Sequence, residues 1–142
     1  MANIVLDSEI LRLMNYFKDI TRVSCRDCFE FNNIIVFVTN ANEAGLAIGR
    51  EGVNKQLLEK KLHKRVKIFG AAESPEGLVK NFMLPVVPEN VSLSEDGSVV
   101  NIKFVQSKER RILLSQNLER LKLLKTAMAR YFPKIMNIMV LQ

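Results

Sequence analysis

The sequence predicts an α+β protein that consists of two small domains in tandem. The chain of 142 residues is long enough for one ordinary domain or for two very small ones. The order strand, helix, tight loop, helix, strand occurs twice along it, with a shift of 66 positions between Gly49 and Ser115. We therefore place one domain at residues 1–74 and the other at residues 75–142.

The first half begins with the pattern of a helix followed by a hairpin. Asp7 can cap a helix over about Ser8–Ile20, in which apolar residues recur at the spacing of one buried face. These residues are Ile10, Leu13, Met14 and Phe17. Val23–Glu30 and the β-branched run Ile34–Thr39 then flank a turn at Asn32-Asn33, and we expect the two stretches to form a hairpin.

Two short helices and a strand complete the first half. A helical stretch, Asn42–Ile48, precedes the tight loop Gly49–Gly52. The next helix, Val53–His63, is expected to bury one apolar stripe. The stripe consists of Val53, Leu57, Leu58 and Leu62. Val66–Phe69 alternates like a half-buried strand and stops at Gly70.

The second half opens with a helix that we expect to join the two domains rigidly. Ser74 can cap it, and Pro85 and Pro88 forbid its continuation, so it is predicted over Pro75–Met83. The elements expected beyond it are a strand around Val91–Leu93, a turn at Glu95–Gly97, a strand at Val99–Val105, helices at Lys108–Leu114 and Gln116–Tyr131, and a strand at Ile135–Leu141.

Composition narrows the class of protein. The apolar share of 48% and the charged share of 25% are typical of folded soluble domains. The net charge of +6 favours a polyanionic partner. No apolar run is long enough to span a membrane, and Asp7 and Glu9 stand where a signal peptide would be basic and then apolar. With only two cysteines, the expected location is the reducing cytoplasm, with no membrane partner.

The loop Gly49-Arg50-Glu51-Gly52 has a specific physical use. Glycines turn the backbone without side-chain bulk, so a nucleic-acid backbone can lie close to the loop. The N-terminus of the following helix offers amides and a positive dipole end to phosphate, and Arg50 adds a full charge. A Gly-x-x-Gly sequence alone is common and also fits a plain helix-to-helix turn. Here Ile48 precedes the loop and an amphipathic helix follows it.

This arrangement resembles the K-homology (KH) module, whose Gly-x-x-Gly loop clamps about four nucleotides of single-stranded RNA or DNA. With a helix and a strand before the core unit, the first half resembles the prokaryotic, type II version. The string from Ala47 to Asn54 is especially similar to the Ile-Gly-Arg-x-Gly-x-Asn signature of the NusA transcription factors. The resemblance to short archaeal NusA-like proteins implies two tandem type II KH-like domains, each a small three-stranded sheet packed against helices.

The resemblance also implies a transcription elongation or termination factor that binds nascent RNA, with RNA polymerase or a transcription complex as a further partner. The sequence itself contains no P-loop, metal-binding cluster or nucleophile elbow, so we expect no catalytic group, cofactor or metal. Bases would enter an aliphatic groove around Ile48, Val53 and Leu57, beside the Lys67–Phe69 strand. Lys55 stands where the family usually has an apolar residue, and Val53 is the candidate for that role. The candidate RNA-binding residues are Ile48, Gly49, Arg50, Glu51, Gly52, Val53, Asn54, Lys55 and Lys67.

The second half departs from the pattern, because Ser115-Gln116-Asn117-Leu118 replaces the glycine loop. The Leu side chain would crowd an approaching backbone. Three alternatives remain open for this domain: weak RNA binding, RNA binding through a different surface, or a role as a brace. Basic charge accompanies both loops, with a net charge of +5 from Arg50 to Lys67 and of +6 from Lys103 to Arg130. One exposed Lys is usually only a solvated side chain, but two such clusters favour a nucleic-acid partner.

Other constellations favour structural roles. Cys25 and Cys28 form a Cys-x-x-Cys, but with His63 they supply one ligand too few for a structural zinc site. We interpret both as packing residues, with a redox pair or an intermolecular metal site as the alternative. The aromatic residues in the predicted strands are expected in the core rather than stacked on bases. These are Phe29, Phe31, Phe37, Phe69 and Phe104.

Two further functions remain as alternatives. One is a ribosome-associated or RNA-processing KH protein. The other is a protein-interaction adaptor, in which the helix Gln116–Tyr131 of the second domain packs on a partner.

Overall fold

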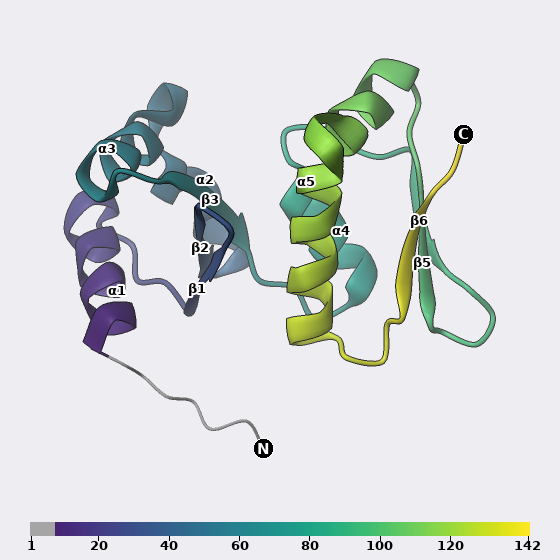
Figure 1. Ribbon diagram of the computed structural model, residues 1–142, viewed down its shortest axis with the longest axis horizontal. Coiled ribbons are helices and arrows are strands. Elements are labelled where there is room, and N and C mark those ends of the chain that lie inside the picture. Colours follow the sequence, from purple (N-terminus) through teal and green to yellow (C-terminus); the bar gives the residue numbers. More distant parts are fainter. Residues whose placement is uncertain (1–7) are drawn as a thin grey trace. The chain divides into compact units, whose positions relative to one another are not determined.

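The computed structural model describes residues 8–142, which divide into two compact units between Ala71 and Ala72 (Figure 1). Each unit contains one three-stranded sheet packed with helices, and the predicted α+β class with two KH-like domains is confirmed. The expected helix cap Asp7 lies outside the described residues. In both sheets the second strand is central, antiparallel to the first and parallel to the third.

The first unit follows the predicted order closely. Its elements are α1 (Ser8–Thr21), β1 (Asp27–Phe31), β2 (Ile34–Thr39), the 3-10 turn η1 (Ala41–Glu43), α2 (Ala44–Ile48), the 3-10 turn η2 (Arg50–Gly52), α3 (Val53–Leu62) and β3 (Arg65–Gly70). Strands β1 and β2 form the predicted hairpin, with Phe31 opposite Ile34. Asn32 adopts a positive φ of 53° in its turn, which asparagine tolerates better than most residues.

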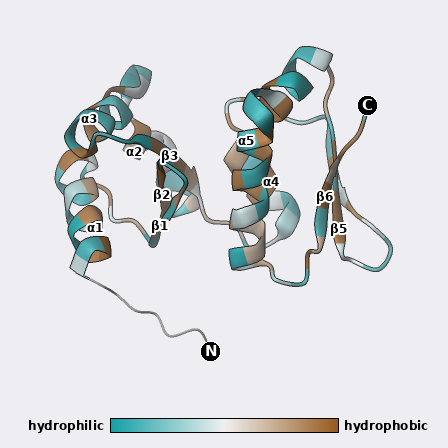
Figure 2. Cartoon of the chain, viewed as in Figure 1, coloured by the Kyte–Doolittle hydropathy of each residue, from teal (hydrophilic) through white to brown (hydrophobic). Residues whose placement is uncertain are grey.

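The core of the first unit lies between the sheet and its helices. Phe17 of α1 stacks on Phe37 of β2, with ring centroids 4.5 Å apart. Figure 2 shows both hydrophobic and hydrophilic residues around α1, as an amphipathic helix requires. The buried cluster consists of Leu13, Phe17, Val23, Cys28, Ile35, Phe37, Ala47, Leu58, Val66 and Ile68.

The prediction that α3 buries one apolar stripe is correct for only two of the four residues. Leu58 is fully buried and Leu62 packs against the core, whereas Val53 and Leu57 are 47% and 49% exposed. Residues four apart share one line along a helix, but neighbours are turned about 100° from each other. The pair Val53 and Leu57 therefore occupies a different face from the pair Leu58 and Leu62, and this face is turned to solvent.

The second unit repeats the arrangement. Its elements are α4 (Pro75–Met83), β4 (Asn90–Leu93), β5 (Val99–Lys103), α5 (Ser107–Tyr131) and β6 (Asn137–Val140). The Oγ atom of Ser74 accepts a hydrogen bond from the Gly77 amide at 3.1 Å, which is the predicted cap. Helix α4 packs against β4 and α5 within this unit, so it contributes to the second fold itself.

The turn between β4 and β5 is tightened by Asp96. Its Oδ1 atom accepts hydrogen bonds from the Ser94 and Ser98 hydroxyl groups at 2.7 and 2.8 Å. These hydrogen bonds to the charged form lower the pKa of Asp96 to about 2. Gly97 completes the turn with a φ of 75°.

Helix α5 contains the break that the sequence predicts. Ser115, Gln116, Asn117 and Leu118 have non-helical backbone angles and separate a first segment, 107–114, from a second, 119–131. The apolar residues of the second segment lie in the core of the unit. They are Leu121, Leu123, Leu124, Ala127 and Met128. Within residues 8–142, no helix has the length and apolar character to cross a membrane.

Candidate nucleic-acid interface

The loop between α2 and α3 is held by its own hydrogen bonds. The Gly49 amide donates to the Gly45 carbonyl at 3.1 Å, and the Gly52 amide donates to the Gly49 carbonyl at 3.0 Å. Gly49, Glu51 and Gly52 have positive φ values of 82°, 55° and 75°. The two glycine amides therefore serve the loop itself, and the residues between them form its exposed tip.

The two glycines are required for different reasons. A Cβ atom at Gly49 would come within 3.0 Å of the Asn54 side chain and 3.1 Å of its backbone nitrogen, so Asn54 fills the space that a side chain would need. A Cβ atom at Gly52 would meet nothing within 4 Å. Only the backbone angle favours glycine there, and the space beside Gly52 is open to an approaching molecule.

Aliphatic side chains are exposed on both sides of this loop. Leu46 of α2 is 68% exposed, and Val53 and Leu57 present the solvent-facing line of α3. Ile48 is half-buried and packs against the core. Because Val53 is exposed, it does not take the inward apolar role that we expected of it, and Lys55 is half-buried. The loop thus lies beside apolar surface that no residue in the range 8–71 covers.

Lys67 stands apart from the other candidate residues. Val66 and Ile68 on either side of it belong to the core cluster beneath the helices. Successive strand residues point to opposite faces, so Lys67 lies on the other face of the sheet, as does the buried Phe69. The structure therefore brings Ile48–Lys55 together around one loop. Lys67 lies apart from them on the edge strand β3, on the face of the sheet opposite the core cluster.

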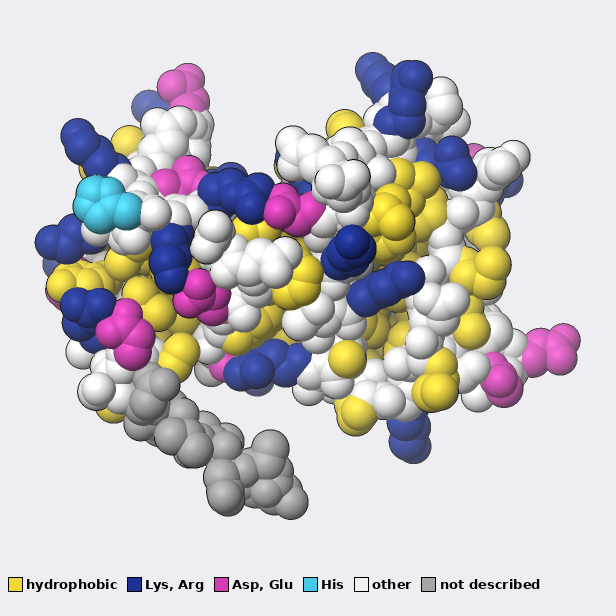
Figure 3. Space-filling view, in the orientation of Figure 1, with side chains coloured by type: hydrophobic (Ala, Val, Ile, Leu, Met, Phe, Trp, Pro, Cys, Tyr) yellow, Lys and Arg dark blue, Asp and Glu magenta, His cyan; other side chains and the backbone are white. Residues whose placement is uncertain are grey.

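Positive charge surrounds the loop and the end of α3. Arg50 is exposed at the tip of the loop. Lys61 lies over the ring of Tyr16, 5.0 Å from its centroid, and Lys64 pairs with Glu30 at 2.8 Å. Figure 3 shows Lys and Arg side chains on the surface of each unit, with hydrophobic side chains between them.

The replaced loop of the second unit keeps much of the same backbone shape. Asn117, with φ and ψ of 56° and 35°, matches Glu51 at 55° and 25°. Leu118, at 64° and 22°, matches Gly52 at 75° and 19°. Left-handed angles cost a non-glycine residue roughly 1–2 kcal/mol. The second unit thus holds a loop of the glycine type without glycine, and the Leu118 side chain stands where the first loop is open.

The remaining titratable candidates, His63, Cys25 and Cys28, lie at the end of a helix or in buried surroundings. His63 ends α3 in a left-handed conformation, and its amide donates to the Glu59 carbonyl at 2.9 Å. Cys28 is buried in the core, and Cys25 is half-buried, which raises the pKa of its thiol to about 11. In the described part of the chain, no group of three or more His, Cys, Asp or Glu could hold a metal ion.

A helix, a hairpin, two helices joined by a tight left-handed loop and a parallel third strand occur in each unit, and this arrangement defines a tandem KH-like protein of type II. The crystal structure of APE1850 has the same fold: it matches with a TM-score of 0.77 and 25% identity, over 96% of this chain and 100% of that one.

Comparison with known sequences gives the family. No family model matches the chain. A probable transcription termination protein NusA from Halococcus morrhuae is 33% identical over 97 residues, which are 68% of this chain and 70% of that protein. Proteins of the same name from Halobacterium salinarum and Methanocaldococcus jannaschii are each 29% identical, over 89% and 88% of this chain and 91% and 71% of their own lengths. The chain belongs to the archaeal NusA family.

Proposed function

We propose that the protein is a transcription elongation or termination factor that binds nascent single-stranded RNA through the loop of its first unit. The observation that carries the proposal is the glycine loop itself. It combines an open side at Gly52, a cationic tip at Arg50 and exposed aliphatic side chains at Val53 and Leu57. A phosphate needs the first two features, and an unstacked base can use the third.

The loop divides these tasks among its residues. Because the Gly49 and Gly52 amides are occupied within the loop, we assign the phosphate to the amides of Arg50 and Glu51 and to the Arg50 guanidinium. Asn54 acts by packing against Gly49 and keeping the loop in shape. Lys67 contributes from the edge of the sheet, where its charge attracts the RNA backbone rather than reads a base.

The family relationship supports the transcriptional role. Relatives over most of the chain are named as probable transcription termination proteins. A factor of this class would act on RNA as it leaves the polymerase, so RNA polymerase or its elongation complex is the expected protein partner. Recovery of polymerase subunits with the tagged protein supports this assignment, whereas recovery of ribosomal subunits alone favours the ribosome-associated alternative.

The adaptor alternative gains no support from the structure. It requires exposed apolar residues along the second segment of α5, but the large apolar side chains of that segment build the core of the second unit. Leu118, at the break, is the large apolar residue that the helix exposes there, with 41% of its surface accessible.

The test is RNA binding by the full chain with a Gly52→Asp substitution. A carboxylate at this open position repels phosphate, so we expect the affinity for a short single-stranded RNA to fall by about tenfold or more. Gly97→Asp is the matched control, because Gly97 has the same φ of 75° and equally open surroundings in a turn of the second unit. Equal affinities of both variants would exclude the loop as the RNA clamp.

A further inference from the structure

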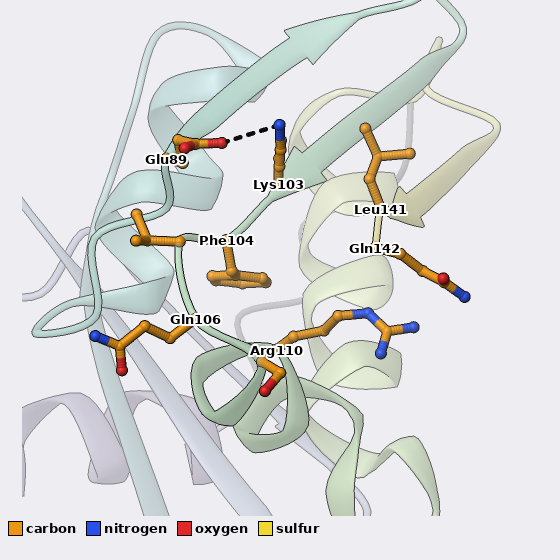
Figure 4. Close-up of a pocket in the computed structure, with 9 residues that line it drawn as sticks. Glu89, Lys103, Phe104, Gln106, Arg110, Leu141 and Gln142 are labelled. Atoms are coloured by element: carbon orange, nitrogen blue, oxygen red, sulfur yellow. Dashed lines mark ion pairs between the residues drawn. The ribbon is translucent and has the colours of Figure 1, made fainter.

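The second unit contains a cavity of about 630 Å³, and no residue of the loop Ser115–Leu118 lines it. It lies where the parallel strands β5 and β6 end and α5 begins (Figure 4). Phe104 and Leu141 supply apolar surface to it, and Lys103, Gln106, Arg110 and Gln142 supply polar groups. A volume of this size is in the range of small-ligand sites.

Arg110 is the unusual residue of this cavity. Its Nε atom is buried, and no residue in the described range 8–142 accepts a hydrogen bond from it. Figure 4 shows the side chain leaving α5, passing below the Phe104 ring and ending on the side of Gln142. The great majority of buried donors in native proteins have a hydrogen-bond partner. To leave a buried donor of a charged group unpaired costs more folding free energy than to leave a neutral donor unpaired. Because Nε is closed to solvent, a ligand in the cavity can reach only the other groups of the Arg110 side chain, which lines the cavity.

The acidic residues nearby are engaged elsewhere. Glu89 pairs with Lys103 at 3.2 Å across the opposite side of the cavity. The Glu109 side chain accepts a hydrogen bond from the backbone amide of Gln106 at 3.3 Å, as part of the capping box at the start of α5. Among the charged side chains that line the cavity, Glu89 and Lys103 pair with each other and Arg110 has no ion pair within residues 8–142, so an anionic ligand fits the cavity better than a neutral one.

The surroundings indicate the kind of anion. An apolar floor beside an arginine suits a phosphate that carries a planar, partly apolar group, which is the chemistry of a nucleotide. The exposed cation Lys108 lies two residues before Arg110 on α5. The left-handed loop at Ser115 begins five residues further along, a distance of about 7.5 Å at the helical rise. A strand of RNA that follows this basic surface would pass the cavity.

We infer that the Arg110 cavity binds one nucleotide through its phosphate, as a contact of the second unit that is separate from the glycine loop of the first. The Arg110 guanidinium donates to the phosphate oxygens, and Phe104 and Leu141 contact the base or the sugar. This inference rests on the proposed RNA-binding function. It also gives the second unit a role in binding that does not need the missing glycines.

The test compares Arg110→Gln with Arg111→Gln in the full chain. Both variants remove one positive charge from the same helix, but Arg111 is exposed and lies outside the cavity. We expect Arg110→Gln to weaken binding of a short single-stranded RNA by about tenfold, and Arg111→Gln by less than about twofold. Because Nε has no hydrogen-bond partner among residues 8–142, the melting temperature of Arg110→Gln should be unchanged or raised. A fall in stability that accompanies the loss of affinity would show a structural role and overturn the inference.

Titrations followed by NMR separate the sources of the nucleotide. Saturable shifts of Phe104 and Gln142 with AMP, absent in Arg110→Gln, support a site for free nucleotides. Shifts with RNA but not with AMP support a site for a nucleotide within a strand. Equal shifts with inorganic phosphate alone would show that the apolar floor contributes nothing, and would overturn the nucleotide assignment.

The same measurements distinguish this inference from the proposed function. If Gly52→Asp loses RNA affinity and Arg110→Gln does not, the glycine loop is the clamp and the cavity is not a nucleotide site. If Arg110→Gln loses affinity and Gly52→Asp does not, the second unit carries the binding and the loop assignment is wrong.

Discussion

At the scale of single residues, the glycine loop shows that two identical residues can have unlike functions. Gly49 is needed for space, because the Asn54 side chain lies where its Cβ atom would be, and it is also needed for its φ of 82°. Gly52 is needed for its backbone angle alone. The Ile-Gly-Arg-x-Gly-x-Asn string is thus one packed unit, in which the asparagine supports the first glycine.

This packing predicts a difference in stability between two alanine variants. Gly49→Ala should lower the free energy of unfolding by more than Gly52→Ala. The left-handed angles of Gly52 cost an alanine about 1–2 kcal/mol, whereas Gly49, with φ and ψ of 82° and 166°, lies in a region almost confined to glycine, and its Cβ atom would also displace Asn54. In an Asn54→Ala background the difference should shrink, since the side-chain part of the conflict is gone. Urea denaturation of the four variants measures this coupling. An unchanged difference in the Asn54→Ala background would contradict the packing argument.

At the scale of elements, the break in α5 is a helix interruption held without glycine. Gln116, Asn117 and Leu118 all have positive φ, and the second and third match the backbone of the first loop. Strained backbone of this kind persists where the surrounding structure enforces it. In the second unit, the buried helix segment 119–131 and the strands beneath it supply that enforcement.

The strain predicts an inverted preference between glycine and alanine at Leu118. In an ordinary helix alanine is more stabilising than glycine by about 1 kcal/mol, and Lys125, exposed on the same helix, should show this order. At Leu118 the left-handed backbone favours glycine. The free energy of unfolding of Leu118→Gly should therefore exceed that of Leu118→Ala by about 1 kcal/mol, and the glycine variant should unfold at a higher urea concentration. The same order at both positions would show that the second loop is not left-handed in solution.

The elements were more predictable from sequence than the faces they present. Helix α4 is marked by Ser74 at one end and by Pro85 after the other, and local signals of this kind need no tertiary information. The outward turn of Val53 and Leu57 depends on which line of α3 meets the core, and both lines are apolar in the sequence. The Arg110 cavity joins the ends of three segments that are far apart in the chain, and no local pattern announces it.

At the scale of the whole molecule, the positive charge divides between two units, each with a candidate contact to RNA. The stretches Arg50–Lys67 and Lys103–Arg130 carry net charges of +5 and +6, although the whole chain has a net charge of +6. The rest of the chain is therefore acidic enough to offset one of the two stretches. Basic charge is concentrated where the loop of the first unit and the cavity of the second unit lie.

This distribution predicts how RNA affinity depends on salt. For single-stranded nucleic acid, the slope of log affinity against log salt changes by about 0.7 for each phosphate contact. Arg50→Gln and Arg110→Gln should each reduce the slope by about that amount, and the double variant should reduce it by about 1.4 if one strand contacts both units. Arg111→Gln is the control, since an exposed charge outside the cavity should leave the slope nearly unchanged. If the double variant loses no more slope than either single variant on a long RNA, the two units do not bind the same strand, and only one of them contacts the transcript at a time.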